Sequence, residues 1–486
     1  MRAPTMPTER PAALPDSNPW RTRALALVCF ATVLRVVESH ATHLWDTEAY
    51  YVSWARWPSL SYYDHPPLVA WTTWLVTRFD TSALAVRMVP IACTAAFGVL
   101  LYRLAARLFS ARAGFFALLT VTVLPAFVGT GVLVNPEGLL APLWILALGA
   151  LYDLRERDEP WRPLLVGALV GVAFLAKYTA VLLVPLALAW LAASRETRRW
   201  LRRPSLYASG LVALAIASPV VIWNAARSFP SLELHLVERA ARPSLATYAT
   251  NGLHALTQQF LFFHPIVFLA FPVVALVSIA RARRDVRYRF LACMAVPTLA
   301  FLWAMMVRVK DSEPHWTMVG YMPLAIAMGG LVDETFDRRA VRAYVATLCA
   351  TSALALALIL AHVASPALVR LVPDSMYDAN ADPLHEMLGW GRIDEAVLRQ
   401  VRALGPRAVV ASDHNVLCGQ LAASLDDTPP VYCLSARRTE FDFVGRGAVP
   451  ADAPVVYVDT ARYPRSPAIA LRGRSCELAE RVNVTR

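Results

Sequence analysis

The chain has 486 residues, of which 57% are apolar and only 17% are charged, and its formal net charge is +11. Soluble globular proteins are about half apolar and about a quarter charged, so the composition excludes an ordinary soluble enzyme. The apolar residues form repeated runs long enough to cross a bilayer as helices. Arginines fill the short loops between these runs, which is typical of the cytoplasmic loops of membrane proteins and argues against nucleic acid as a partner.

In chain order, residues 1–20 are rich in proline and lack an apolar core, so we expect a disordered cytoplasmic tail. Residues 21–364 are then expected to form a transmembrane domain with about eleven helices. The outer loops expected between them are residues 38–81, 224–264 and 308–316. The predicted spans are residues 24–37, 82–104, 113–131, 139–152, a pair within 164–193, 206–223, 265–280, 290–307, 317–332 and 344–364.

The apolar block 164–193 is basic at both ends, which requires an even number of crossings. We therefore predict two short helices that reverse near Lys177, Tyr178 and Thr179. Each half is shorter than the roughly 20 residues of a normal crossing, so Lys177 is expected at a turn recessed into the outer half of the membrane. A lysine at that depth is costly unless it meets water, an anion or a carboxylate.

Residues 365–486 change in composition. A helical pattern at 394–402 is followed by short apolar runs at 408–412, 431–434 and 455–458, which predicts a small extracytoplasmic α/β domain. Cys418 and Cys433 either pair in an oxidising compartment or stay buried as free thiols.

The first outer loop carries acids beside the membrane. Asp46 and Glu48 are candidates for a catalytic base, but two residues apart on a helix they point to nearly opposite sides, so one alone would face a substrate. The structural alternative makes Asp46 an N-terminal helix cap. Trp54, Trp57, Trp71 and Trp74 are expected to be anchors at the membrane interface rather than platforms for a sugar.

Asp64 and His65 precede Pro66 and Pro67, which fix a rigid entry to the next helix. Asp64 could orient His65, bind a metal or contact a sugar hydroxyl. The alternative is a capping Asp with an interfacial His.

Further candidates lie in later outer loops. Glu137 adds a carboxylate, or marks an ordinary helix–helix turn. Arg308, Lys310 and His315 follow one span and, with Lys177, could cradle a phosphate, or could meet lipid headgroups. The sequence has no P-loop, no GxGxxG followed by an acid and no GxSxG, so a nucleotide-dependent enzyme is disfavoured.

The stretch EAYYVSWARWPSLSYYDHPPLVAW, together with VNPEGLLAPLW, AKYTAVLLVP and KDSEPHW, resembles the bacterial glycosyltransferase family 39 group. These are protein-mannosyltransferase-like enzymes of the GT-C fold, similar in design to the aminoarabinose transferase of lipid A and to rhizobial core galacturonosyltransferases. The resemblance spans most of the membrane domain and, more loosely, the α/β tail.

The resemblance implies an inverting enzyme of the bacterial cytoplasmic membrane, with its site and C-terminal domain facing outside. It would move a sugar from a polyprenyl phosphate to a glycolipid, a glycan or a protein. The family usually has adjacent Asp-Glu before Ala-Tyr-Tyr, whereas Thr47 separates the acids here, so either acid could be the base. A divalent metal such as Mg²⁺ or Mn²⁺ is left open, with Asp46, Glu48, Asp64 and His65 as its candidate ligands. The substrate-binding candidates are Tyr50, Tyr51, Tyr63, Asp64, His65, Glu137, Lys177, Tyr178, Arg308, Lys310 and His315.

Two other functions compete with the enzyme. A transporter or flippase of a lipid-linked saccharide should place its polar groups near the bilayer midplane, whereas the polar clusters here are predicted at one face. A non-catalytic scaffold would leave the acids and Lys177 unexplained.

Overall fold

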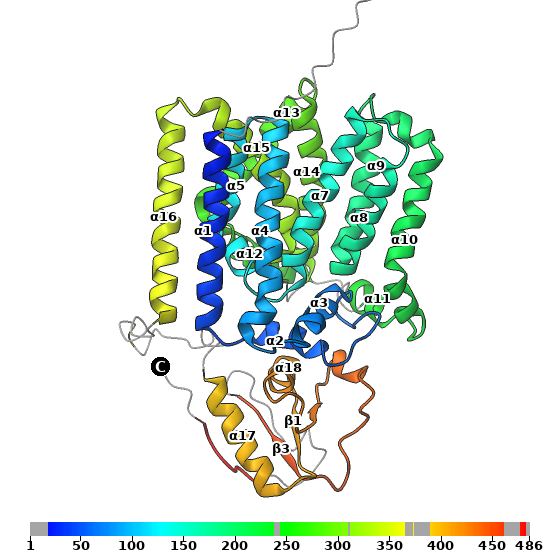
Figure 1. Ribbon diagram of the computed structural model, residues 1–486, viewed down its shortest axis with the longest axis vertical. Coiled ribbons are helices and arrows are strands. Elements are labelled where there is room, and N and C mark those ends of the chain that lie inside the picture. The colour runs from blue at the N-terminus through cyan, green and yellow to red at the C-terminus, as the bar shows by residue number, and fades with distance from the viewer. Residues whose placement is uncertain are drawn as a thin grey trace, which may run out of the picture.

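The structure is a computed structural model that describes residues 18–237, 244–309, 312–364, 373, 389–460 and 477–482. Long helices stand side by side and form a bundle, and a small α/β unit covers one end of it (Figure 1). The helices of the bundle are α1 (Pro19–Ala41), α4 (Ala83–Leu108), α5 (Ala111–Thr122), α6 (Pro125–Gly129), α7 (Pro136–Glu156), α8 (Arg162–Ala176), α9 (Leu183–Ala193), α10 (Pro204–Ala225), α13 (Pro265–Arg281), α14 (Val286–Arg308), α15 (Met318–Thr335) and α16 (Arg339–Ala364).

The predicted spans coincide with helices, except that the span 113–131 is divided between α5 and α6. Helix α1 begins earlier than expected, at Pro19, inside the proposed tail. The remainder of that tail, residues 1–17, lies outside the described residues. Among the described residues, five helices are long and apolar enough to cross a membrane, and a bent pair makes up to six. Four shorter apolar helices accompany them. The predicted number of eleven crossings is therefore larger than the helix lengths alone establish.

Local sequence sets where these helices begin. Ser82, Ser110 and Asn135 each accept a hydrogen bond from a backbone amide of the first turn of α4, α5 and α7. Such caps satisfy amide groups that have no partner inside the helix. Pro136, at the first position of α7, also favours a helix start there, because its fixed φ suits the first turn. The short turns are thus encoded locally, which fixes where Glu137 begins its helix.

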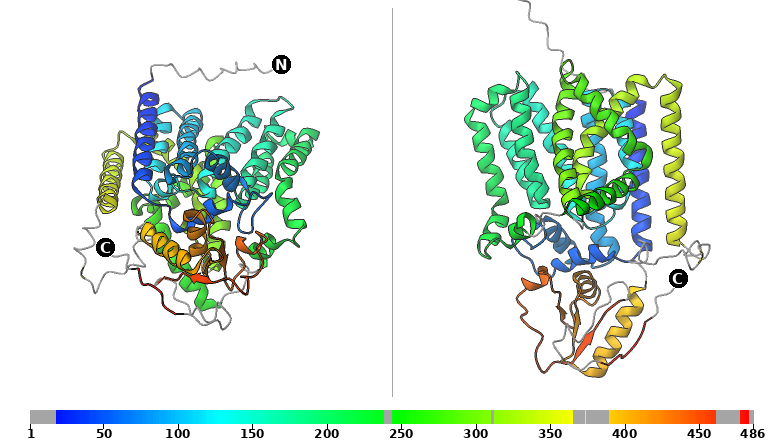
Figure 2. Two further views of the ribbon diagram at one scale, coloured as in Figure 1. Left: turned by 60° about the horizontal axis from the view of Figure 1, so that its bottom comes forward. Right: turned by 180° about the vertical axis from the view of Figure 1, so that it is seen from behind.

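The block 164–193 folds as the predicted pair. Helix α8 ends at Ala176, Lys177 adopts an extended conformation, and a 3₁₀ turn, η1 (Tyr178–Leu182), leads into α9. The segment 224–264, which was predicted as an outer loop, is largely helical. It contains α11 (Pro230–Leu232), a π-helical turn η3 (Glu233–Val237) and α12 (Leu245–Phe262), which lies crosswise at the end of the bundle (Figure 2). Helix α12 meets α13 at a bend of 106°.

The first outer loop folds into two short helices, α2 (Asp46–Trp54) and α3 (Leu68–Thr77), across the same end of the bundle (Figure 1). Trp54 was expected at the membrane interface, and this expectation is wrong. It is fully buried and stacks on Tyr62, with ring centroids 4.9 Å apart and planes 8° from parallel. The loop is a packed element because its aromatic side chains supply their own core.

The C-terminal unit, which we define as residues 389–460, contains three short parallel strands and two helices. They are α17 (Trp390–Leu404), β1 (Val409–Ser412), α18 (Asn415–Ser424), β2 (Val431–Cys433) and β3 (Val455–Tyr457), with a 3₁₀ turn η8 (Glu440–Asp442). The strand order is β2-β1-β3, with Val410 opposite Val431 and Val456. A disulfide joins Cys418 of α18 to Cys433 of β2.

The C-terminal unit is seated on the outer loop. Helix α18 runs beside α2, and Gly419 lies so close to Tyr50 that an added Cβ would meet the Tyr50 Cα at 2.6 Å. Near the end of α2, Arg56 donates to the Ala423 carbonyl at 3.0 Å and pairs with Asp426. This packing positions the loop that carries the predicted acids.

Candidate functional site

Glu48 is held by a buried arginine. Its carboxylate accepts from Arg87 Nε at 2.9 and 3.1 Å and from Arg87 Nη2 at 2.6 Å. It also accepts from the backbone amides of Val134, at 2.9 Å, and Trp45, at 3.1 Å. Both oxygens are therefore engaged, and the two side chains are almost completely buried. This geometry suits a structural carboxylate rather than a base that takes up protons.

Sequence reasoning missed Arg87. Its guanidinium is fully buried and also donates to the carbonyls of Ser39, Thr42 and His43, so it ties the end of α1 to α2. One signal could have found it. Clusters of arginines fill the turns at the opposite end of the bundle, whereas Arg87 lies one helical turn inside α4. An arginine inside an apolar segment points to a specific partner.

Asp46 is the first residue of α2 and is also buried. Its Oδ1 accepts from the amide and the hydroxyl of Thr47. Its other oxygen, Oδ2, has no hydrogen-bond partner among the described residues. The N-cap of α2 is Trp45, so Asp46 does not serve as the cap. Of the two predicted acids, Asp46 is thus the one that keeps an oxygen without a partner within the described part of the chain.

Asp64 is bound by Tyr50, whose hydroxyl donates to Oδ2 at 2.7 Å. The residue at the N-cap of α3 is Pro67, so Asp64 is not a capping acid. His235 of η3 lies with its Nε2 3.0 Å from the Asp64 carbonyl oxygen. The centroid of its ring lies 5.2 Å from that of Tyr178 and 6.5 Å from that of His65. His235, absent from the predicted site, thus joins the first outer loop to the turn after α8.

Glu137 meets two of the predicted basic residues. Its Oε1 pairs with Lys177 Nζ and lies 3.0 Å from His315 Nε2. The carboxylate is 8% exposed and the lysine 9%, so the pair is shielded from bulk water. The three residues line a small pocket with Thr179 and Trp316. Lys177 therefore has the carboxylate partner that a buried ammonium group requires.

Four residues connect these two groups. Val134 donates its amide to Glu48, and Glu137 follows three residues later, at the start of α7. Asn135 between them caps α7 through the Gly138 amide at 2.8 Å. The acidic loop and the lysine turn consequently share one rigid connection at the same end of the bundle (Figure 1).

The other predicted residues have mixed positions. Tyr51 packs with its ring 5.7 Å from His65, and Tyr63 stacks on Phe443 at 5.4 Å. Arg308 is the last residue of α14, at the same end of the bundle. Lys310 lies outside the described residues, so its place in a phosphate cradle stays a prediction.

No group of three or more His, Cys, Asp or Glu side chains gathers in a metal-binding arrangement within the described part of the chain. Glu48 could serve as a ligand only by giving up Arg87. The predicted set of Asp46, Glu48, Asp64 and His65 therefore does not fit a metal ion as it stands.

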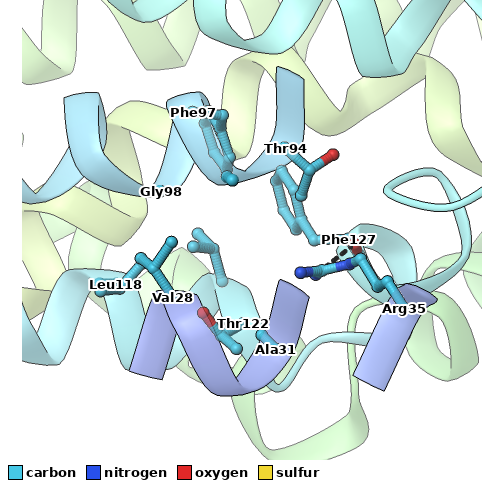
Figure 3. Close-up of a pocket in the computed structure, with 11 residues that line it drawn as sticks. Val28, Ala31, Arg35, Thr94, Phe97, Gly98, Leu118, Thr122 and Phe127 are labelled. Atoms are coloured by element: carbon cyan, nitrogen blue, oxygen red, sulfur yellow. Dashed lines mark hydrogen bonds between the residues drawn. The ribbon is translucent and has the colours of Figure 1, made fainter. Parts of the chain in front are cut away.

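A second pocket lies inside the bundle, between α1, α4 and α5, and contains a buried arginine (Figure 3). Arg35 of α1 points into it and donates to the Phe127 carbonyl at 3.2 Å. The space for the Arg35 side chain depends on Gly131, since a Cβ added at this glycine would lie 2.9 Å from Arg35 Nε. The remaining lining is mostly apolar, so the arginine holds α6 in place rather than extending the acidic site.

The chain is similar to known proteins in sequence and in fold. The family model of dolichyl-phosphate-mannose-protein mannosyltransferases matches residues 64–223. The lipid A galacturonosyltransferase RgtD of Rhizobium johnstonii is 26% identical over 305 residues. That alignment covers 61% of this chain and spans 63% of the relative's length.

Among solved structures, ArnT from Cupriavidus metallidurans bound to undecaprenyl phosphate has a TM-score of 0.59 and 16% identity. The similarity covers 89% of this chain and 90% of ArnT. The apo state of the same protein has a TM-score of 0.58. The chain therefore shares its fold with ArnT, contains several apolar helices long enough to cross a membrane, and is similar in sequence to glycosyltransferases over part of its length.

Proposed function

We propose that the chain is an inverting glycosyltransferase that takes a sugar from a polyprenyl phosphate. The observation that carries the proposal is the difference in hydrogen bonding between the two acids of α2. Glu48 is saturated by Arg87 and two amides, whereas Asp46 keeps one oxygen without a partner among the described residues. Asp46 is therefore the base of the proposed reaction.

The reaction is a single displacement. The oxygen of an acceptor hydroxyl bonds to the anomeric carbon while the bond from that carbon to the phosphate oxygen breaks. The hydroxyl proton passes to Asp46 Oδ2, and polyprenyl phosphate leaves with the bonding electrons. Attack opposite the leaving group inverts the anomeric centre. A positioned base of this kind contributes about 10²- to 10⁴-fold to the rate.

Lys177 and His315 would receive the phosphate. Positive side chains at a developing phosphate charge stabilise the transition state, most of all where water is excluded. Lys177 is buried, His315 is partly exposed, and both already contact an anionic group, the Glu137 carboxylate. The same two nitrogens are proposed to contact the phosphate oxygens. Arg308 and Lys310 are proposed to complete it. The ArnT structure similar in fold was solved with undecaprenyl phosphate, which supports this class of donor.

We further propose eleven crossings, with the acidic loop and the C-terminal unit on the periplasmic face. Arginine-rich turns gather at the opposite end of the bundle, as cytoplasmic loops do. A bacterial inner-membrane location follows. The relative RgtD is a lipid A galacturonosyltransferase, which favours a glycolipid acceptor over a protein or a free glycan.

The alternative function, a transporter or flippase of a lipid-linked saccharide, fits the site less well. Glu48, Glu137 and Lys177 are locked in buried ion pairs at one end of the helices. Transport sites are instead built near the bilayer midplane, at interrupted helices.

The test compares envelope glycolipids by mass spectrometry in a deletion strain complemented with wild type, Asp46→Asn or Asp452→Asn. Asp452 is a matched control, since it is 70% exposed in the C-terminal unit. We expect a sugar that is present with wild type and Asp452→Asn and missing with Asp46→Asn at equal protein levels. Identical glycans in the deletion and wild-type strains would sink the enzyme proposal. Transfer that survives in Asp46→Asn would reject the assigned base.

A further inference from the structure

The C-terminal unit reaches into the core of the first outer loop through η8. The Glu440 amide donates to the Tyr50 hydroxyl at 3.0 Å. The Glu440 carboxyl group, through Oε2, accepts from the Tyr63 amide at 2.6 Å. One residue of the C-terminal unit thus binds both ends of the folded loop, α2 through Tyr50 and the segment before α3 through Tyr63.

This contact is built into the fold. Asp442 accepts from the Thr439 amide at 2.7 Å and closes the turn that carries Glu440. Phe441 packs 6.3 Å from the Tyr50 ring and 5.7 Å from Trp57, and Phe443 stacks on Tyr63. Glu440 is only 3% exposed. A carboxyl group is rarely placed so deeply without a specific task.

The contact leads to the proposed base in two steps. Tyr50 is one helical turn beyond Asp46 on α2, so the two share a face of the helix. Tyr50 also donates to Asp64 at 2.7 Å. The hydrogen bonds of the Tyr50 hydroxyl therefore restrain the rotation of α2 about its axis. That rotation sets the direction in which the Asp46 side chain points.

We propose that Glu440 is a positioning residue through which the C-terminal unit holds α2 and the Tyr63 segment in the geometry that the transferase reaction requires. The proposal rests on the proposed function for its catalytic consequence, but its structural part does not. It assigns the C-terminal unit a role inside the site.

The electrostatic surroundings indicate which form of Glu440 performs this role. Burial raises the pKa of Glu440 well above its ordinary range, and the hydrogen bond from Tyr63 only partly opposes this. The charged groups that face it are Asp64 and Asp442, which raise the pKa further, and Arg227, which lowers it. Tyr50 and Tyr62 also lie beside it, and burial raises the pKa of both hydroxyls. The protonated carboxyl group is therefore favoured in the folded protein.

The sign of the pH effect follows from linkage. Because the folded state holds this proton to a higher pH than the unfolded state, stability falls as the pH rises from the ordinary pKa of 4.5 to the raised one. In that window the folding equilibrium constant falls by up to about tenfold per pH unit. Glu440→Gln removes this dependence, because its amide oxygen still accepts from Tyr63 and carries no titrating proton.

The experiment uses the full-length protein in detergent and measures two properties that need no catalysis. Hydrogen exchange of the peptide around Tyr63 should speed up about tenfold in Glu440→Ala and stay near wild type in Glu440→Gln. Thermal unfolding followed from pH 5 to 9 should show wild type losing stability relative to Glu440→Gln as the pH rises. Glu395→Gln, an exposed glutamate on α17, is the matched control and should follow wild type.

Activity is measured on the same samples. We expect Glu440→Ala to lower kcat about tenfold with an unchanged KM for the donor, and Glu440→Gln to restore it. Wild-type exchange at Tyr63 in Glu440→Ala, or a pH profile of stability that Glu440→Gln leaves unchanged, would overturn the proposal. If wild type transfers no sugar, the proposed function fails, while the exchange and unfolding data still decide the role of Glu440.

Discussion

Arg87 and Glu48 form a buried ion pair that links α4 to α2, with Arg87 Nη2 2.6 Å from Glu48 Oε2 and both side chains at most 1% exposed. The Glu48 carboxylate accepts five hydrogen bonds in all, three from Arg87 and two from the backbone amides of Trp45 and Val134. The pair therefore explains why one of two neighbouring acids is structural.

Removing one partner of this pair should unfold or weaken the protein. A lone buried charge costs about 3–5 kcal/mol, so Glu48→Gln and Arg87→Met should each lower the thermal unfolding temperature and the yield of folded protein. The double variant should recover part of the loss, because neither charge is left alone. Fluorescence-detected size exclusion after heating measures the effect. A Glu48→Gln protein with wild-type stability but no activity would instead make Glu48 catalytic.

Asp46→Asn should act on the chemistry alone. The amide keeps the oxygen that Thr47 binds, so we expect wild-type stability, a donor KM within about threefold of wild type and a kcat lower by about 10²- to 10⁴-fold. Steady-state kinetics with the purified protein and its donor give both constants. A large rise in KM with an unchanged kcat would assign Asp46 to binding.

Lys177→Met should weaken the binding of polyprenyl phosphate and also leave Glu137 as a buried charge with only His315 beside it. The double variant Lys177→Met with Glu137→Gln should regain stability and still lack donor binding, which separates the structural from the binding role of the lysine. Titration with polyprenyl phosphate, followed by native mass spectrometry, measures the affinity. Recovery of binding in the double variant would exclude Lys177 as a phosphate ligand.

The Cys418–Cys433 disulfide closes a loop of 15 residues and anchors α18, the helix that packs against α2. A crosslink of that length contributes about 3 kcal/mol in the chain-entropy model. Replacing both cysteines with serine should therefore lower the stability of the C-terminal unit and expose α18 to proteases. Limited proteolysis with mass mapping checks this. Cys93 and Cys293 of the bundle, replaced in the same way, are controls.

The sequence predicts much of the scaffold. Apolar runs bounded by arginines locate the long helices that end at arginine-rich turns, because bilayer thickness and loop charge act on local composition. Helix α12 was missed, since its residues were predicted to form an outer loop. The reversal at Lys177 follows from the same counting, and α8 and η1 confirm it. Strands β1, β2 and β3 lie where the short apolar runs are, since period and length are properties of a few neighbouring residues.

Tertiary structure decides what each polar residue does. Nothing near Glu48 in sequence indicates Arg87, which is 39 residues away, and nothing near Tyr63 indicates Glu440, which is 377 residues away. The sequence therefore leaves Asp46 and Glu48 as equal candidates and makes Trp54 an interfacial anchor. Long-range packing separates the acids, because the partners of a buried polar group come from whichever segments the fold brings together. Trp54 is buried by aromatic neighbours from its own loop, among them Tyr62, which contact it only once that loop has folded.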